Sequence, residues 1–520
     1  RLSLFPLLIF LMDVLLLFLV QGLCFLILVG QFLNNSERPS TFQQYQNTKI
    51  NNILSLINED YVDSINQHKL EESAIRSILK ELDPHSTYIG KKTIKSVTEK
   101  MEGSFGGIGV EFNIQKDSIV VVAPIAGGPS ERLGVKSGDR IVLVDEENVA
   151  SIGIDNDGVI DRLRGEIGTK VNVSIKRKGV KQLLDYTIAR GEIPLHSLDV
   201  KLMLGEQTGY IKLNRFSATT FEEFSKASTG LLEKGMQNLI LDLRGNPGGY
   251  LGAAINISNQ FLTNKEMILF TEGRSRKKQE FFADKSGLLI ACKVVVLVDE
   301  GSASASEIVA GALQDNDRGK IIGRRTFGKG LVQEQIPMLD GSVVRLTTQR
   351  YYTPTGRSIQ KAYEKGDSEG YYMEVYKREK KDSSAIADSL IFTTPKGNIV
   401  YGGGGISPDI LIAIDTTLDS KKLAIFFSKN WVFDFCFEYA DKQREMLTKN
   451  ALLTADIWTP FIAFVKKKNV DFIFDLEKNE VAYLKKQIRS SIGRNLFGNE
   501  VFYQLLLEDD MFVERARAEF

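Results

Sequence analysis

The chain has 520 residues, and its 66 basic and 66 acidic side chains give a formal net charge of zero, which argues against a nucleic-acid-binding protein. Charged residues make up 25% of the chain and hydrophobic residues 43%, as in ordinary folded proteins, and the length allows several domains. The three cysteines are far apart and only three histidines are present, so we expect no disulfide framework and no metal site.

The first residues differ from the rest of the chain in composition. Residues 14–36 carry no charge and are mostly Leu, Phe, Val and Ile, a run long enough to cross a bilayer core of about 30 Å. We therefore predict that residues 1–35 form a membrane anchor or a signal segment. The anchor is favoured because the run lacks a clear small-residue cleavage pattern. A buried helix of a soluble domain is the alternative.

Residues 36–96 are predicted to form an N-terminal helical region. Apolar residues recur at helical spacing over residues 48–82 and predict two helices joined near Tyr61. Pro84 disfavours helix at the residue before it and so ends the second helix. His85 lies in the turn that follows, where we expect a structural role, with a catalytic base as the alternative.

Residues 97–190 change to short strands separated by turns, with two short helices between them, and predict a small β-rich module. Its glycine-hydrophobic loop, Gly107-Ile108-Gly109, and the block at residues 129–141 resemble a PDZ domain. The resemblance implies that a peptide C-terminus adds to the module as a strand. The N–H groups of Gly107, Ile108 and Gly109 would then hold its carboxylate. A tight turn with no binding role is the alternative for this loop.

Residues 191–415 alternate between predicted strands and helices, which indicates an α/β core. The strands are expected over residues 209–213, 238–244, 267–270 and 293–298, and the helices over residues 219–233 and 251–262. Glycines at positions 245, 248 and 249 lie between a buried strand and a helix, where free N–H groups can hold an anion. A plain turn is the alternative.

Two further segments contain no catalytic motif. Residues 361–390 are charged with little periodicity and are predicted to be a solvent-exposed excursion. Residues 416–520 have a helical, charged pattern and are predicted to form a helical C-terminal appendage.

The stretch at residues 294–333 holds the candidate catalytic residues. An apolar strand is followed by small residues, among them Ser302, Ser304 and Ser306, and then by a helical pattern. This is how α/β enzymes present a nucleophile at a helix N-terminus. Ser304 and Glu307 also match the capping box S-x-x-E, so a purely structural cap, by Ser304 or by Ser302, is the alternative.

A serine hydroxyl attacks an amide only when a neighbouring base takes its proton. No histidine lies near Ser304 in the sequence, and Lys329 is the candidate base. The pKa of a free lysine is about 10.4, and burial must lower it by roughly three units. Gly328, Gly330 and the apolar residues that follow favour such burial. Gln333 can hold the amine without adding charge; a surface lysine in a glycine turn is the alternative.

Three motifs together resemble the carboxyl-terminal processing peptidase family, the tail-specific serine proteases of S41 type. They are residues 241–249, 301–307 and 326–333, in this order and preceded by the PDZ-like module. The resemblance extends from about residue 82 to residue 409.

The resemblance assigns roles to residues of these motifs. It implies that Ser304 is the nucleophile, that Lys329 is the general base and that Gln333 orients the lysine. It also implies an oxyanion hole formed by the N–H group of Ala305 and that of Gly248 or Gly249.

The resemblance also implies a multidomain α/β protein, with a crotonase/ClpP-like α/β protease core, an inserted β-rich PDZ domain and helical N- and C-terminal parts. We expect a serine endopeptidase that recognises substrate C-termini through the PDZ domain and cleaves through an acyl-enzyme, without a cofactor or metal. Expected partners are proteins or peptides with accessible C-termini, the membrane through residues 14–36, and no nucleic acid; a homo-oligomer is left open. The expected location is the periplasmic side of a bacterial inner membrane. A catalytically inactive PDZ scaffold and an acyl-CoA enzyme of crotonase architecture are the alternatives.

Overall fold

The computed structural model describes residues 49–115, 117–380 and 388–520. The chain divides between Ile78 and Leu79 into two compact units. The expected membrane segment, residues 14–36, lies outside the described residues. In the described part of the chain, no helix combines the length and the apolar character that a bilayer crossing requires.

Two helices begin the described chain, as the apolar spacing predicts. They are α2 (Lys49–Asp60) and α3 (Gln67–Lys80), and β1 (Thr87–Ile89) and α4 (Lys91–Glu102) follow them. The side chain of Asn66 accepts the N–H of Lys69 at 3.0 Å at the start of α3. α4 ends at Gly103, whose φ of 85° is left-handed, a conformation that glycine adopts without steric cost.

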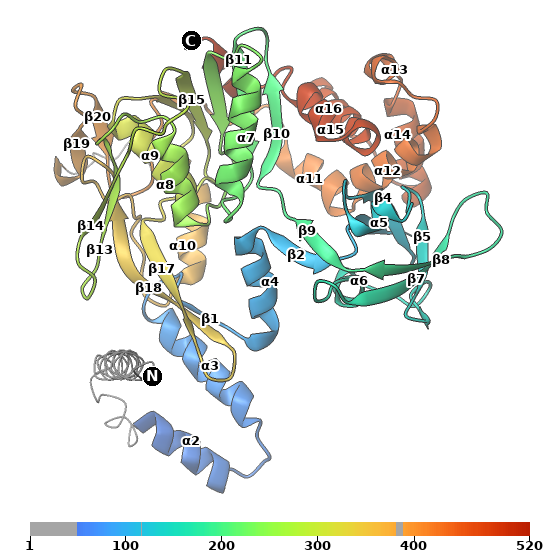
Figure 1. The fold of residues 1–520 in the computed structure, drawn as a ribbon, viewed down its shortest axis with the longest axis horizontal. Coiled ribbons are helices and arrows are strands. Elements are labelled where there is room, and N and C mark those ends of the chain that lie inside the picture. Colours follow the sequence, from blue (N-terminus) through green and yellow to red (C-terminus); the bar gives the residue numbers. More distant parts are fainter. Residues whose placement is uncertain (1–48, 116, 381–387) are drawn as a thin grey trace, which may run out of the picture. The chain divides into compact units, whose positions relative to one another are not determined.

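A six-stranded sheet forms the core of the second unit (Figure 1). Its strands in spatial order are β10 (Leu198–Met203), β11 (Thr208–Leu213), β12 (Asn238–Asp242), β15 (Lys293–Val298), β16 (Lys320–Gly323) and β21 (Ile410–Leu411). The strands from β11 to β21 pair in parallel, whereas β10 pairs antiparallel with β11. This sheet confirms the α/β core that the strand and helix alternation predicts.

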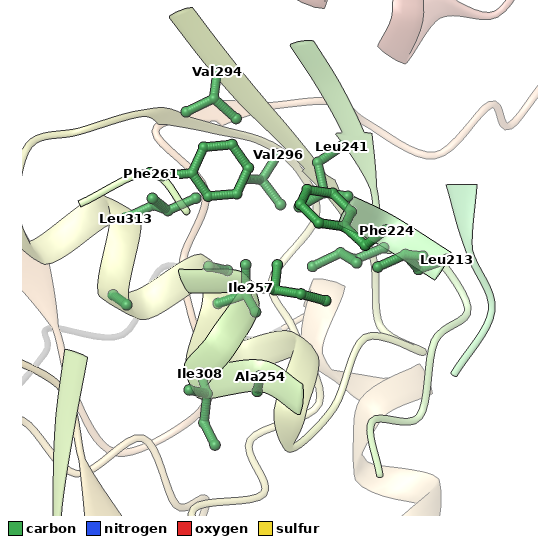
Figure 2. Close-up of a cluster of buried hydrophobic side chains, with 14 of the residues drawn as sticks. Leu213, Phe224, Leu241, Ala254, Ile257, Phe261, Val294, Val296, Ile308 and Leu313 are labelled. Atoms are coloured by element: carbon green, nitrogen blue, oxygen red, sulfur yellow. The ribbon is translucent and has the colours of Figure 1, made fainter. Parts of the chain in front are cut away.

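Both faces of this sheet are buried, which explains the unbroken apolar run of β15. Val294, Val296 and Val298 pack into a cluster with α7 (Thr220–Leu232), α8 (Leu251–Asn259) and α9 (Ala305–Asp315). Figure 2 shows this cluster, with Phe224 and Ile257 facing the strands. The alternate residues of β15 pack on the other face against α17 (Met511–Arg517).

A second, antiparallel sheet carries part of the site. It contains β1, β13 (Met267–Glu272), β14 (Gln279–Phe282), β17 (Leu331–Pro337) and β18 (Val343–Tyr352). β17 and β18 form a hairpin whose turn includes Gly341, with a φ of 86°. β18 pairs with β1 on its other side over Thr87–Ile89, so the segment around His85 lies beside this hairpin.

The PDZ module is inserted through two adjacent strands, β2 (Ser104–Gly107) and β9 (Gly191–Pro194), which pair antiparallel. Its sheet has the order β3-β4-β5-β7-β8, with β6 paired to β5. The elements are β3 (Val110–Ile114), β4 (Ile119–Pro124), α5 (Pro129–Arg132), β5 (Arg140–Val144), β6 (Glu147–Asn148), α6 (Asn156–Leu163), β7 (Lys170–Lys176) and β8 (Leu184–Ala189). β3 is an edge strand that directly follows the loop Gly107-Ile108-Gly109.

The C-terminal part is helical, as predicted. Its helices are α11 (Ser420–Ser428), α12 (Trp431–Gln443), α13 (Lys449–Thr454), α14 (Trp458–Lys468), α15 (Lys478–Phe497), α16 (Asn499–Leu506) and α17. Helices α11 to α16 share an apolar cluster of their own, which includes Phe426 and Phe461. α17 instead packs on the core sheet, so the chain returns to the α/β core at its end.

The prediction of a solvent-exposed excursion over residues 361–390 is correct only in part for the residues that the structure describes, 361–380 and 388–390. Residues 361–380 contain α10 (Ser368–Met373) and the 3-10 helix η2 (Glu374–Lys380). The 3-10 helix η3 (Asp388–Leu390) and the strands β19 (Ile391–Thr393) and β20 (Ile399–Tyr401) come later in the chain. Lys361 and Tyr371 are buried. The Lys361 ammonium lies 3.1 Å from a carboxylate oxygen of Glu374, whereas the four charged residues at positions 364, 365, 367 and 369 are exposed. Some charges of this segment therefore pair with each other, and others face solvent.

Candidate active site

Two loops of the core meet because they leave neighbouring parallel strands at the same edge. β12 and β15 pair in register up to Asp242 and Leu297. The glycine turn at residues 245–249 follows β12, and the three serines follow β15. In open α/β sheets, ligands bind at this carboxyl edge.

Ser304 differs from the two serines beside it. The hydroxyls of Ser302 and Ser306 are buried and donate to the carbonyl oxygens of Leu243 and Asn246, at 2.8 and 2.9 Å. Ser304 instead lines a cavity of about 510 Å³. Its φ of 56° and ψ of −112° place it at a strained turn before α9, the backbone geometry that exposes a nucleophile at a strand-to-helix junction.

The cavity brings together the candidate residues of three separate motifs. Its lining comprises Met101, Pro247, Gly248, Gly249, Tyr250, Leu251, Ser304, Ala305, Ile308, Lys329, Leu331, Val332, Gln333, Gln335, Arg345 and Tyr351. The expected nucleophile, base, orienting amide and oxyanion donors are all among them. The PDZ loop residues 107–109 do not line this cavity.

Lys329 has the environment that a lysine base requires. Burial lowers the pKa of Lys329 to about 8, and the charge of Arg345 acts in the same direction, while Glu307 and Asp83 oppose the shift. Its Nζ donates to Oε1 of Gln333 at 3.0 Å. The bond to a neutral amide holds the amine without the charge that would keep it protonated.

Glu307 joins the two halves of the site, a role that the sequence did not reveal. Its carboxylate accepts the N–H of Ser304 at 2.8 Å, which is one half of a capping box, and the N–H of Lys329 at 2.9 Å. It also accepts the N–H of Gly328 at 2.7 Å and the hydroxyl of Thr326 at 2.5 Å. The carboxylate is fully buried, and burial raises its pKa, which these hydrogen bonds oppose. The capping-box match pointed to the bond with Ser304 alone.

The glycine turn approaches Ser304 too closely for any side chain. A Cβ on Gly248 would lie 2.4 Å from the carbonyl oxygen of Ala303 and 2.8 Å from Cβ of Ser304. The N–H of Gly248 donates to Oδ1 of Asn246 at 2.9 Å. Asn246 is a second residue that the sequence left without a role, and its backbone carbonyl accepts the N–H of Ala303 at 3.0 Å. It thereby ties the turn to the segment that carries Ser304.

Of the two glycines predicted to contribute to an oxyanion hole, Gly249 has the freer N–H. The bridge between Phe216 and Gly249 uses the carbonyl of Gly248 and the N–H of Tyr250. Within the described residues, the N–H of Gly249 takes part in neither this bridge nor a side-chain bond. Gly249 is therefore the better placed of the two to donate to a substrate oxyanion.

The ring of His85 makes edge contacts with the rings of Tyr371 and Tyr372. Its Nε2 is 3.0 Å from the hydroxyl of Tyr371. Burial lowers the pKa of His85 to about 3, and Lys329 adds to the shift, so the ring is neutral at physiological pH. The backbone carbonyl of His85 accepts Nε2 of Gln333 at 2.6 Å. This contact fixes the amide and supports the structural role expected for His85.

The PDZ loop forms a second candidate site. The carbonyl of Ile108 accepts the N–H and the hydroxyl of Ser130, at 3.0 and 2.6 Å, which holds the loop against α5. Gly109 has a left-handed φ of 73°. Elsewhere among the described residues, no group of three or more His, Cys, Asp or Glu side chains has a metal-binding arrangement.

Comparisons with known proteins match each part of this architecture. Residues 207–368 match peptidase family S41, residues 106–188 match the PDZ domain, and residues 30–93 match the N-terminal domain of the activating protease CtpB. These matches bear out the protease core and the inserted PDZ domain that the sequence motifs predict.

Three curated relatives cover different shares of the chain. Carboxy-terminal processing protease CtpB of Bacillus subtilis is 38% identical over 60% of this chain, and the match spans 65% of its own length. The carboxy-terminal-processing protease of Bartonella bacilliformis is 38% identical over 64% of this chain and 77% of its own. CtpA of Bacillus subtilis is 32% identical over 85% of this chain and 90% of its own. The chain belongs to the carboxy-terminal processing proteases, serine peptidases of family S41.

Proposed function

We propose that the chain is a serine endopeptidase with a catalytic dyad of Ser304 and Lys329. The observation that carries the proposal is that a partly buried lysine, bonded to the neutral amide of Gln333, lines the same cavity as Ser304. The two other serines of the motif are bound to backbone carbonyls, which supports Ser304 as the nucleophile.

The lowered pKa of Lys329 makes the lysine a usable base. At pH 7 a group with a pKa of about 8 is neutral in about a tenth of the molecules, against about one in a few thousand for a free lysine. The environment therefore raises the reactive fraction by a factor on the order of 300.

The reaction proceeds in two steps. Nζ of Lys329 takes the proton from Oγ of Ser304 as the oxygen attacks the scissile carbonyl carbon. The N–H groups of Ala305 and Gly249 hold the oxyanion. When the C–N bond breaks, Lys329 returns the proton to the leaving amine, and an acyl-enzyme remains on Ser304. Water, deprotonated by Lys329, then hydrolyses the ester and restores both residues.

The PDZ domain recognises the substrate. Among the described strands, β3 pairs with β4 alone and lies at the edge of the sheet, so a peptide can add to its open edge. The N–H groups of Gly107, Ile108 and Gly109 at the start of this edge bind the terminal carboxylate. Substrates are proteins or peptides with accessible C-termini.

We further propose that residues 14–36 hold the enzyme on the periplasmic side of a bacterial inner membrane. The uncharged apolar run of the sequence supports this location. Expression of the full chain and of a version lacking residues 1–35, followed by membrane fractionation, tests it. Recovery of the full chain in the soluble fraction at its unprocessed mass would contradict the anchor.

The catalytic assignment is tested with the full chain in detergent and a set of peptides with free C-termini. The parent should cleave them and react at Ser304 with a fluorophosphonate, as seen by mass spectrometry. Ser304→Ala should lose both reactions but keep peptide binding by fluorescence anisotropy. Lys329→Arg should also be inactive, because arginine stays protonated.

A catalytically inactive scaffold would give a different pattern. Parent and Ser304→Ala would then bind peptides equally well, and neither would cleave them. Cleavage that survives in Ser304→Ala would exclude this serine as the nucleophile.

A further inference from the structure

Arg345 lines the catalytic cavity from β18, the strand that pairs with β17. β17 begins two residues after Lys329. Arg345 lies opposite Gln335 of β17 and Thr87 of β1. The next pair on the same side of the hairpin is Gln333 with Thr347, and two residues along a strand span about 7 Å. Arg345 is therefore one side-chain row away from the amide that holds Lys329, and it lines the same cavity.

Within the part of the chain that the structure describes, the charge of Arg345 has no counter-charge. Among the described residues, no carboxylate forms an ion pair with it, and burial alone lowers its pKa. Arg244 and Arg357, by contrast, lie 2.6 Å from the carboxylates of Asp242 and Asp315. A half-buried guanidinium without a partner is unfavourable unless a ligand completes it.

The charges of the side chains that line the cavity indicate which chemical group it binds. Lys329 and Arg345 are basic, and the other side chains that line the cavity are apolar, amide or hydroxyl groups, with no Asp or Glu in the lining. A peptide that enters this cavity meets net positive charge beside the nucleophile. A guanidinium binds a carboxylate through two parallel N–H bonds, which gives it geometric selectivity.

We propose that Arg345 is a specificity-determining residue that binds a substrate carboxylate within a few residues of the scissile bond. The proposal rests on the peptidase function proposed for this cavity and extends it to the class of substrate. The carboxylate comes either from an Asp or Glu side chain or from a terminus that lies close to the cleaved bond.

The proposal is tested with the full chain and peptides that differ in one charge. Once mass spectrometry has located the cleaved bond of a reference peptide, Glu and Gln versions are made at each of the neighbouring positions. A second pair ends shortly after the bond, with a free or an amidated terminus. In the parent, kcat/KM should favour the carboxylate member by about 10- to 100-fold at one position.

Three variants distinguish the effect of Arg345 on the charge preference from general effects of a substitution on activity. Arg345→Gln should abolish the preference, and Arg345→Lys should retain part of it. Arg350→Gln is the matched control, since Arg350 is an exposed arginine of the same strand that does not line the cavity, and it should keep the full preference. A parent without charge preference at any position, or a preference that survives Arg345→Gln, would overturn the proposal.

Peptide binding to the Ser304→Ala variant tests the role of Arg345 independently of the proposed peptidase activity. Tighter anisotropy binding of carboxylate peptides that is lost with Arg345→Gln supports the role of Arg345 even if the parent cleaves nothing. Cleavage without charge preference leaves the peptidase function intact and removes the role of Arg345. A charge preference that is confined to the side-chain pairs, or to the terminal pair, identifies the source of the carboxylate. Binding of the peptide terminus by the PDZ domain is the same in the parent and in Arg345→Gln, so a difference between these two proteins comes from Arg345.

Discussion

Nζ of Lys329 donates to Oε1 of Gln333 at 3.0 Å, and the same amide donates from Nε2 to the carbonyl of His85 at 2.6 Å. The second bond decides which end of the amide faces the lysine, because a carbonyl oxygen can only accept. Lys329 is thus held in place by a neutral acceptor, and its pKa is set mainly by burial.

Replacement of this amide by a carboxylate should impair the base. In Gln333→Glu the new charge favours the protonated lysine and raises the pKa of Lys329 by about one unit or more. Activity at pH 7 should fall by about tenfold or more, and the midpoint of kcat/KM against pH should move upward. Gln333→Met is the control, since it loses the hydrogen bond without adding charge, and its midpoint should not rise. An unchanged midpoint in Gln333→Glu would mean that Lys329 is not the titrating base.

The pH dependence of the parent follows from the same group. Lys329 acts as a base only when neutral, and its pKa is about 8, so kcat/KM for an uncharged peptide should rise with pH and reach half its maximum near pH 8. Between pH 7 and pH 9 the increase should be about tenfold. The measurement is a kcat/KM profile from pH 6 to 10, with circular dichroism at each pH to confirm that the fold persists. A flat profile over this interval would contradict the lysine base.

Gly248 should tolerate no side chain because of its approach to Ser304. In Gly248→Ala the new Cβ meets the carbonyl oxygen of Ala303 at 2.4 Å, so the glycine turn or the serine must shift. A displacement of about 1 Å can cost about 100-fold in rate, and kcat should fall by this order.

Gly245→Ala is the matched control for that variant. Gly245 also has a left-handed φ, of 66°, but no atom lies within 4 Å of its virtual Cβ. It should lose about 1 kcal/mol of stability from backbone strain while keeping most of its kcat. Equal losses of kcat in the two variants would show that the contact with Ser304 is not what requires Gly248.

The end of the chain should stabilise the core through Asp510. Its carboxylate accepts Nη1 of Arg244 at 2.8 Å and caps α17 by accepting the N–H of Phe512 at 2.9 Å. Asp510→Asn keeps an acceptor for the cap but loses the ion pair, whereas Asp510→Ala loses both. We expect the alanine variant to be less stable than the asparagine variant by about 1 kcal/mol, as measured by urea unfolding. Equal midpoints would mean that the cap contributes nothing.

Features that depend on neighbours in the chain could be predicted from the sequence. The apolar run of β15 is a buried parallel strand, and the helical spacing around Tyr61 corresponds to α2 and α3. The roles of Ser304, Lys329 and Gln333 were predicted from the resemblance of three motifs to the family, whereas the residues by themselves left a capping serine and a surface lysine as alternatives. Which of the three serines faces the cavity could not be read from their spacing, since each is flanked by small residues.

Contacts between distant segments could not be predicted. The charges of residues 361–380 indicated an exposed loop. In the structure, however, Lys361 and Arg378 form ion pairs with Glu374, and the ring of Tyr371 packs against that of His85. Nothing local marks Asp510 as the partner of Arg244, because 266 residues separate them. Pairing across such distances depends on which strands become neighbours in a sheet.

The sequence alone therefore determined the elements of this protein, its PDZ insertion and the residue types of its candidate dyad, because hydrophobic spacing, glycine turns and local motifs are properties of short stretches. Only the tertiary structure decided that Glu307 binds the backbone of both Ser304 and Lys329, that Gly249 rather than Gly248 has the freer N–H, and that Arg345 faces the same cavity. These relationships arise where the carboxyl ends of β12 and β15 meet the β17–β18 hairpin. Burial at that junction, and not the order of residues, sets the charge state of the lysine.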